Sequence, residues 1–259
     1  MTAATRADPP VVDLGAIDDT SRQLWREAIA VMAELDGPWT LVGGLMVQLH
    51  ATRHNQLEMR VTVDVDILAD SRRRPSGTER IGAQLERIGF VPAPAHILRN
   101  PTTAFRFERD GVVVNLLAPD HGGERTPPMS VRGFQTLEAA GGTQALARSE
   151  TVVVRLDDSE VAIRCPNLLG AILMKVRSVT SSHRAKDRDD LVSLLACVDD
   201  PIALQKEIKR TESGWLRRAE RAVALDDPDL RGRLPAEQVE QARVAFRLLL
   251  APESGSPLR

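Results

Sequence analysis

The sequence predicts an α+β fold, in which a mixed β-sheet with flanking helices is followed by a C-terminal helical region. Strand patterns and helical patterns alternate between residues 39 and 164, whereas every segment from Pro166 onward has helical spacing. The chain has 259 residues, 42% of them hydrophobic and 27% charged, which is ordinary for a globular protein with a proper core. We expect a flexible tail over 1–20, an α/β core over 21–165 and a helical domain over 166–259.

Charge and cysteine content exclude several classes of protein. A net charge of −2 gives no overall attraction to nucleic acid or to an anionic membrane, so such a partner must meet a local patch. Cys165 and Cys197 lack the spacing of a disulfide scaffold or a zinc site. No apolar run has membrane-spanning length, and the first ten residues lack the apolar stretch of a signal peptide. We therefore expect a cytoplasmic protein without a membrane partner.

Each expected element follows from its own pattern. Helical spacing of apolar residues predicts a helix over 21–35, which the Asp36-Gly37-Pro38 stop signal ends. Alternation around an Asp110-Gly111 turn predicts a hairpin. Gly89 is a plausible C-cap for the amphipathic helix before it. The remaining expected elements are strands at 39–42 and 60–67, helices at 45–53 and 77–90, a first hairpin over 103–119, a second over 151–164 turning at 157–159, helices at 166–180, 186–198, about 203–222 and 236–250, and a link over 225–235.

The strand at 60–67 carries the first candidate site. Its sequence, RVTVDVDI, places β-branched residues on one face and Asp64 and Asp66 on the other, although Asp is among the residues least favoured in strands. Two carboxylates two residues apart on a strand are about 6.5–7 Å apart on one face. They can converge on divalent cations for phosphoryl transfer, although glycosyltransferases and phosphatases also use Asp-x-Asp, and a solvated acidic face is equally compatible.

Gly43-Gly44 favours a phosphate ligand. The pair ends a predicted strand and begins a predicted helix, so the backbone can approach a ligand and the helix N-terminus offers unpaired N–H groups to a phosphate. A tight turn alone would also explain two glycines. The order strand, Gly-Gly, helix and Asp-x-Asp strand is more specific than either motif by itself.

The segments LVGGLMVQLHATR and RVTVDVDIL together resemble the polymerase-β-type nucleotidyltransferases, and most closely the AbiEii-like toxins of type IV toxin–antitoxin systems, which include the MenT toxins. The resemblance covers roughly residues 40–195. It implies a nucleotidyltransferase-type mixed sheet and transfer of a nucleoside monophosphate from NTP to an acceptor, with Mg²⁺ or Mn²⁺ bound by Asp64 and Asp66. It also implies tRNA or another RNA as the acceptor, a cognate antitoxin as a partner, and nucleotide contacts from Gly43, Gly44, Arg60 and Thr62.

Two helical segments, LLGAILMKVRSV and KDRDDLVSLL, match further family elements. Lys175 lies within the apolar row of its helix, in a chain with lysine only at 175, 186, 206 and 209. An inward lysine favours contact with a phosphate, whereas a snorkelling side chain is the alternative. Asp187 is a plausible catalytic residue through the resemblance, but it also stands where an N-cap belongs, with Asp190 three residues on as in a capping box. We expect Asp190 to cap or to form an ion pair.

Asn115 departs from the family pattern. Relatives usually carry a third carboxylate on the strand that here reads GVVVNLLAPD. An amide can bind a metal through its carbonyl oxygen, but it adds no negative charge and cannot accept a proton. Two interpretations follow: an active enzyme with two strand acids, or a catalytically silenced relative that binds nucleotide or a protein partner. The run Arg72-Arg73-Arg74 could contact an RNA backbone, although such a run is usually a solvated loop.

Overall fold

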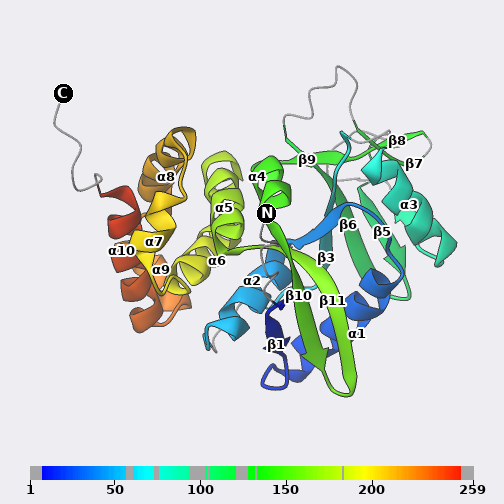
Figure 1. The fold of residues 1–259 in the computed structure, drawn as a ribbon, viewed down its shortest axis with the longest axis horizontal. Helices are drawn as coiled ribbons and strands as arrows, with labels where there is room; N and C mark the ends of the chain where they lie inside the picture. Colours follow the sequence, from blue (N-terminus) through cyan, green and yellow to red (C-terminus); the bar gives the residue numbers. More distant parts are fainter. Residues whose placement is uncertain are drawn as a thin grey trace, which may run out of the picture.

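The computed structural model describes residues 8–56, 61–72, 76–93, 103, 105–120, 128–131, 133–182 and 184–251. Figure 1 shows a β-sheet with helices α1 (Asp19–Ala33) and α3 (Gly77–Arg87) beside it, and a group of helices at the opposite end of the molecule. Mixed sheets and helices in one chain confirm the predicted α+β class.

The main sheet has the strand order β2-β3-β6-β5-β4, with β9 also paired to β6. Its strands are β2 (Trp39–Val42), β3 (Val65–Ala69), β4 (Val91–Ala93), β5 (Arg106–Arg109), β6 (Val112–Pro119) and β9 (Leu137–Ala139). β3 runs antiparallel to β2 and parallel to β6, and the register places Asp66 directly opposite Asn115. The sheet is therefore mixed, as predicted, and it joins the two polar strand positions that sequence analysis selected.

The predicted beginning of β3 is wrong. The strand begins at Val65 rather than at residue 60, and Val61 and Val63 are 45% and 76% exposed instead of facing a core. The alternation of buried residues holds only from Val65 to Ile67. Asp64 therefore stands just before the strand, and Asp66 within it.

A second sheet has the order β1-β10-β11, formed by β1 (Val11–Asp13), β10 (Ser149–Leu156) and β11 (Ser159–Pro166). β10 and β11 are the predicted second hairpin. The prediction of a flexible tail over 1–20 is wrong for residues 11–13, because β1 pairs with β10 and its Val12 is buried. The sheeted core therefore begins before residue 21. Among the described residues, β7 (Met129–Val131) and β8 (Phe134–Gln135) form a further short ribbon.

The local signals in the N-terminal half predicted most elements correctly. α1, β2, α2 (Gly43–Arg53) and α3 agree with their predicted positions to within a few residues. Gly89 has φ 91° directly after the C-cap of α3, and Asp110 and Gly111 have φ 51° and 83° in the turn between β5 and β6. α4 (Gly142–Ala147) was not predicted.

The C-terminal helices are α5 (Leu168–Ser182), α6 (Ala185–Ala196), α7 (Pro201–Lys206), α8 (Arg210–Val223), α9 (Pro228–Arg233) and α10 (Ala236–Leu250). They occupy the end of the molecule away from the main sheet (Figure 1). The single helix predicted over 203–222 is two helices, and the predicted link over 225–235 contains α9. Local start signals account for the differences: Asp200 and Asp227 cap helices that begin with proline, and a capping box formed by Lys209 and Glu212 starts α8.

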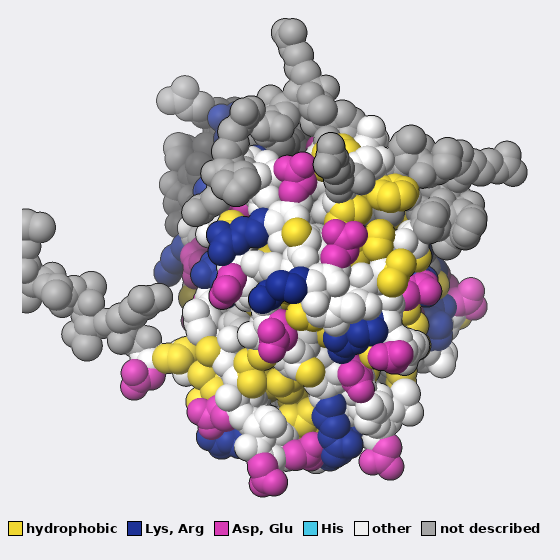
Figure 2. Space-filling view, turned by 90° about the vertical axis from the view of Figure 1, so that its right-hand side faces the viewer, with side chains coloured by type: hydrophobic (Ala, Val, Ile, Leu, Met, Phe, Trp, Pro, Cys, Tyr) yellow, Lys and Arg dark blue, Asp and Glu magenta, His cyan; other side chains and the backbone are white. Residues whose placement is uncertain are grey.

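The surface agrees with the small net charge. On the face shown in Figure 2, acidic and basic side chains are interspersed, with hydrophobic side chains between them. No helix in the described part of the chain combines the length and the apolarity needed to cross a bilayer.

Candidate nucleotidyltransferase site

The amide of Asn115 brings together two aspartates, Asp64 just before β3 and Asp66 within it. Asn115 Nδ2 donates to Asp64 Oδ2 at 2.9 Å and to Asp66 Oδ1 at 2.8 Å. Both bonds form only when the NH₂ group, rather than the carbonyl oxygen, faces the acids. Asp64, Asp66 and Asn115 therefore share one face of the sheet. The NH₂ group of the Asn115 amide lies between the two carboxylates.

Each remaining carboxylate oxygen also has a defined neighbour. Thr62 is buried, and its hydroxyl donates to Asp64 Oδ1 at 3.1 Å. Thr62 was predicted to contact nucleotide, and here it orients Asp64. Asp66 Oδ2 lies against Gly43, where a Cβ would stand 1.8 Å from that oxygen. Arg60, the other predicted residue of this segment, lies outside the described residues.

Gly43 meets two requirements at once. Its φ is 70°, a conformation that favours glycine, and its missing side chain leaves room for the Asp66 carboxylate. Gly44 is buried in the first turn of α2, whose N-cap, Val42, makes no side-chain cap bond. The first turn of α2 therefore begins next to the acid pair without a side-chain cap, which suits it to an anion.

The environment shifts the protonation of Asp66. Burial and, to a lesser extent, the charge of Asp64 raise the pKa of Asp66 to about 6, while the Asn115 hydrogen bond, Lys175 and Lys186 act in the opposite direction. Two like charges held close together in a partly buried place are costly, and a cation would relieve that cost. Lys186 was not among the predicted site residues. The signal was present in the sequence, because the chain has only four lysines and this one stands directly before Asp187.

Lys175 points inward, as predicted, but its partner is a carboxylate. Its Nζ donates to Asp190 Oδ2 at 2.6 Å, and the two side chains are only 8% and 3% exposed. A snorkelling lysine is therefore excluded, and the expected ion pair of Asp190 is confirmed. The charge of Lys175 still reaches the acid pair, since it lowers the pKa of Asp66.

Asp187 is buried, but it is not the helix cap that its position suggested. The N-cap of α6 is Arg184, without a side-chain cap bond, and Asp187 accepts a hydrogen bond from Ser182 at the end of α5. Two polar contacts thus join α5 to α6, Lys175 with Asp190 and Ser182 with Asp187. Among the described contacts, Asp187 bonds to Ser182 and not to the acid pair.

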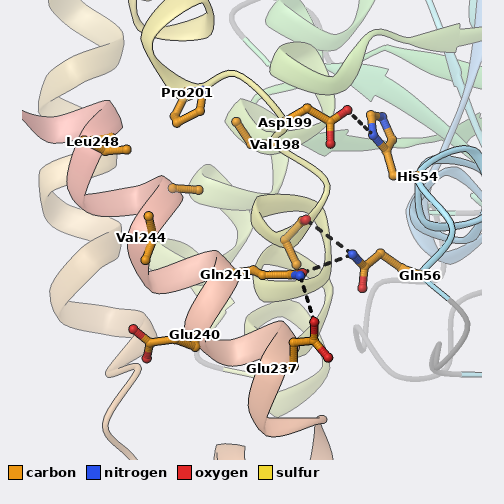
Figure 3. Close-up of a pocket in the computed structure, with 12 residues that line it drawn as sticks. His54, Gln56, Val198, Asp199, Pro201, Glu237, Glu240, Gln241, Val244 and Leu248 are labelled. Atoms are coloured by element: carbon orange, nitrogen blue, oxygen red, sulfur yellow. Dashed lines mark hydrogen bonds and ion pairs between the residues drawn. The ribbon is translucent and has the colours of Figure 1, made fainter.

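A separate groove of about 680 Å³ lies along α10, and none of the predicted site residues lines it. Figure 3 shows His54 bonded to Asp199, and Gln56 bonded to Gln241 of α10. These contacts join the end of α2 to the helical region. Sequence analysis did not predict this groove.

The fold is similar to that of a nucleotidyltransferase-like protein of known structure. A crystal structure of an antigenic nucleotidyltransferase-like protein from Paracoccidioides brasiliensis matches with a TM-score of 0.51 and 15% identity, over 86% of this chain and 94% of that chain. The CD-NTase CdnG of Bradyrhizobium diazoefficiens, in complex with GTP, aligns over 92% of this chain and 87% of that chain with 15% identity, but its TM-score of 0.25 is too low to argue from. Neither protein-family models nor curated protein sequences gave a match.

The chain therefore has a nucleotidyltransferase-like α+β fold, and the AbiEii-like relationship stays a prediction.

Proposed function

We propose that the protein is a metal-dependent nucleotidyltransferase that moves a nucleoside monophosphate from NTP to an acceptor. The observation that carries this proposal is the convergence of Asp64 Oδ2 and Asp66 Oδ1 on one point, the Asn115 nitrogen, at 2.9 and 2.8 Å. The nucleotidyltransferase-like fold and the uncapped start of α2 beside the pair support the same conclusion.

The residues present fit a hard divalent cation. The partly positive NH₂ group of Asn115 stands between the two carboxylates, which supports binding of positive charge at this point. In the described part of the chain, no group of three or more His, Cys, Asp or Glu could hold a metal. Mg²⁺ or Mn²⁺ would be held by the two carboxylates of Asp64 and Asp66, with the Asn115 carbonyl oxygen as a neutral ligand if the amide turns over, and with NTP oxygens completing the shell.

Other groups of the chain would bind the triphosphate and add positive charge. When bound, the metal supplies charge neutralisation and polarisation of the phosphoryl oxygens. The first-turn N–H groups of α2, at Gly43 and Gly44, would bind the triphosphate at the positive end of the helix. Lys175, held by Asp190, would add a fixed positive charge near Asp66.

The resemblance to AbiEii-like toxins extends the proposal to its partners. It makes an RNA, and tRNA in particular, the proposed acceptor, and it makes a cognate antitoxin a proposed protein partner. Asp187 remains a proposed catalytic residue on that ground alone. A small regulator encoded beside this gene would support the toxin role, and an isolated gene would weaken it.

A catalytically silenced protein that binds nucleotide is the second candidate. Asn115 favours it, since the amide replaces a carboxylate and its NH₂ group satisfies both acids without a metal. We prefer the active enzyme because a silenced one gains nothing from keeping two repelling carboxylates so close together.

The test is transfer of label from α-labelled NTP to total cellular RNA in the presence of Mg²⁺. Asp64→Asn and Asp66→Asn each keep the side-chain shape and remove one charge, so each should abolish labelling. Asp158→Asn, in the exposed turn between β10 and β11, is the matched control and should label like the wild type. Undiminished labelling by both site variants would refute the assignment.

A further inference from the structure

A second cavity lies at the end of the β2–β3 pair that is farther from the acids. It has a volume of about 600 Å³, and three arginines from three separate elements line it: Arg72 after β3, Arg80 of α3 and Arg164 of β11. We call it the arginine cavity. From Asp66 to its wall at Asp70, four residues of strand span roughly 13 Å.

The arginine cavity carries uncompensated positive charge. Its one acidic lining residue, Asp70, is paired with Arg72, with Arg72 Nε 2.7 Å from Asp70 Oδ1. In the described part of the chain, Arg80 pairs with no carboxylate, and the guanidinium of Arg164 reaches only the Ser149 carbonyl oxygen at 3.4 Å. Two guanidinium groups therefore face the same cavity without a counter-charge.

The turn of α3 that carries Arg80 is anchored to the loop before β2, whereas the Arg80 side chain itself is exposed. Its guanidinium lies over Gly37, whose ideal Cβ would stand 3.5 Å from Arg80 Nε and whose φ is 117°. One turn further along α3, Gln84 accepts from the Asp36 N–H at 3.0 Å and donates to the Asp36 carbonyl oxygen at 3.3 Å. The wall that carries Arg80 is therefore fixed before any ligand arrives, which lowers the entropic cost of binding.

Apolar groups complete the lining beside the arginines, with Pro38 and Trp39 from the entry to β2 and Leu146 from α4. A ligand that suits this lining has an anionic part for the guanidinium groups and a flat apolar part. Arginine is the preferred side chain for bidentate contact with phosphate. A cavity of several hundred cubic ångströms is the size that encloses one small organic ligand.

We propose that the arginine cavity binds a phosphate-bearing nucleotide unit, with Arg80 and Arg164 as its phosphate ligands. The unit comes either from the backbone of an RNA or from a free nucleotide. The RNA source rests on the proposed function, because an RNA whose reacting end lies at Asp66 needs further contacts along the enzyme surface. The free-nucleotide source does not depend on the proposed function.

The experiment is direct binding in EDTA, with the acid pair silenced by Asp66→Asn so that no turnover intervenes. Arg80→Gln and Arg164→Gln are introduced together. Arg87→Gln with Arg247→Gln is the control, since it removes the same charge from two exposed arginines outside the cavity. All four side chains are exposed, so both double variants should fold. The probes are a short unstructured fluorescent RNA, followed by anisotropy over a range of salt concentrations, and ATP, followed by calorimetry.

If RNA is the source, the cavity variant should bind RNA about tenfold more weakly than the control variant, with the slope of log affinity against log salt smaller by about 1.4 for two lost contacts. If a free nucleotide is the source, the variant should lose ATP affinity and keep RNA affinity. Equal affinities of the two double variants for both probes, or no binding of either probe by their common parent, would overturn the proposal. Label transfer by the wild type is measured separately, so failure of the proposed function leaves this result readable.

Discussion

Asn115 is the residue at which the chemistry of the proposed site departs most from that of a three-acid site. We expect Asn115→Asp to lower the melting temperature in EDTA, since three carboxylates would then repel one another where the amide now donates to two. With Mn²⁺ or Mg²⁺ present, the same change should tighten metal binding and, if a general base is missing, raise the labelling rate about 10²-fold or more.

The comparison needs wild type and variant, with melting measured in EDTA and in Mn²⁺ and labelling measured in parallel. The register already places residue 115 opposite Asp66. A variant with unchanged melting, metal affinity and turnover would show that residue 115 does not serve as the third metal position.

The raised pKa of Asp66 makes a prediction about stability and pH. The folded state binds a proton at Asp66 more tightly than the unfolded chain, whose value is near 3.8, so metal-free stability falls as pH rises from about 4 to about 6. Asp66→Asn removes this penalty. The variant should exceed wild type in free energy of unfolding at pH 7 by up to about 3 kcal/mol, and the difference should vanish near pH 4.

Urea unfolding in EDTA at both pH values measures that difference. Asp158→Asn serves as the control because its side chain is exposed in a turn. A variant that is no more stable than wild type at pH 7 would mean that the acid pair is not strained in the absence of metal.

At the scale of elements, the junction between β2 and α2 depends on Gly43. In Gly43→Ala, a Cβ would overlap the Asp66 carboxylate at a φ of 70°, so the carboxylate and the backbone must both move. The left-handed conformation alone costs roughly 1–2 kcal/mol for alanine. We expect lower stability and loss of labelling.

Gly214→Ala in α8 is the matched control. The nearest atom to its Cβ is the tip of the Arg218 side chain at 3.9 Å, and alanine favours a helix over glycine by up to about 1 kcal/mol. That variant should be slightly more stable and fully active. Equal behaviour of the two alanine variants would contradict the geometry described for Gly43.

Variants of the Lys175–Asp190 ion pair, which joins α5 to α6, distinguish a structural role of Lys175 from a role in the proposed site. Lys175→Met removes the cation of the buried Lys175–Asp190 ion pair, which should cost about 3–5 kcal/mol of unfolding free energy. Adding Asp190→Leu should restore most of that loss, because it replaces a buried ion pair by apolar contacts. If Lys175 acts in the site, the stable double variant should still fail to label RNA; normal labelling would reduce Lys175 to a structural residue. Chemical denaturation and the labelling assay are the two measurements.

How far the sequence predicts an element depends on how local its signals are. Caps, turn residues and helical spacing lie within a few positions, and they located α1, α3, α10 and both hairpins. The beginning of β3 was misplaced because Val61 and Val63 fit the period of a strand, but the structure leaves both exposed, so the pattern alone could not reveal whether a core covers them. Whether a valine is buried is decided by tertiary contacts.

At the scale of the whole molecule, the sequence did not predict contacts between residues far apart in the chain. Residues 11–13 look like part of a polar tail, yet they form β1 because β10, far along the chain, offers an edge to pair with. The ion pair of Lys175 with Asp190 and the contact of Asp66 with Gly43 likewise required the fold. The motifs selected candidate residues, and the structure shows which of them touch.

The central claim is that Asp64 and Asp66 hold a divalent cation, and calorimetric titration with Mn²⁺ tests it most directly. We predict that the wild type binds one ion without nucleotide, that a second ion binds only when NTP is present because Asn115 adds no charge, and that Asp66→Asn abolishes the first binding event. Absence of Mn²⁺ binding by the wild type with and without NTP, or undiminished binding by Asp66→Asn, would contradict the account.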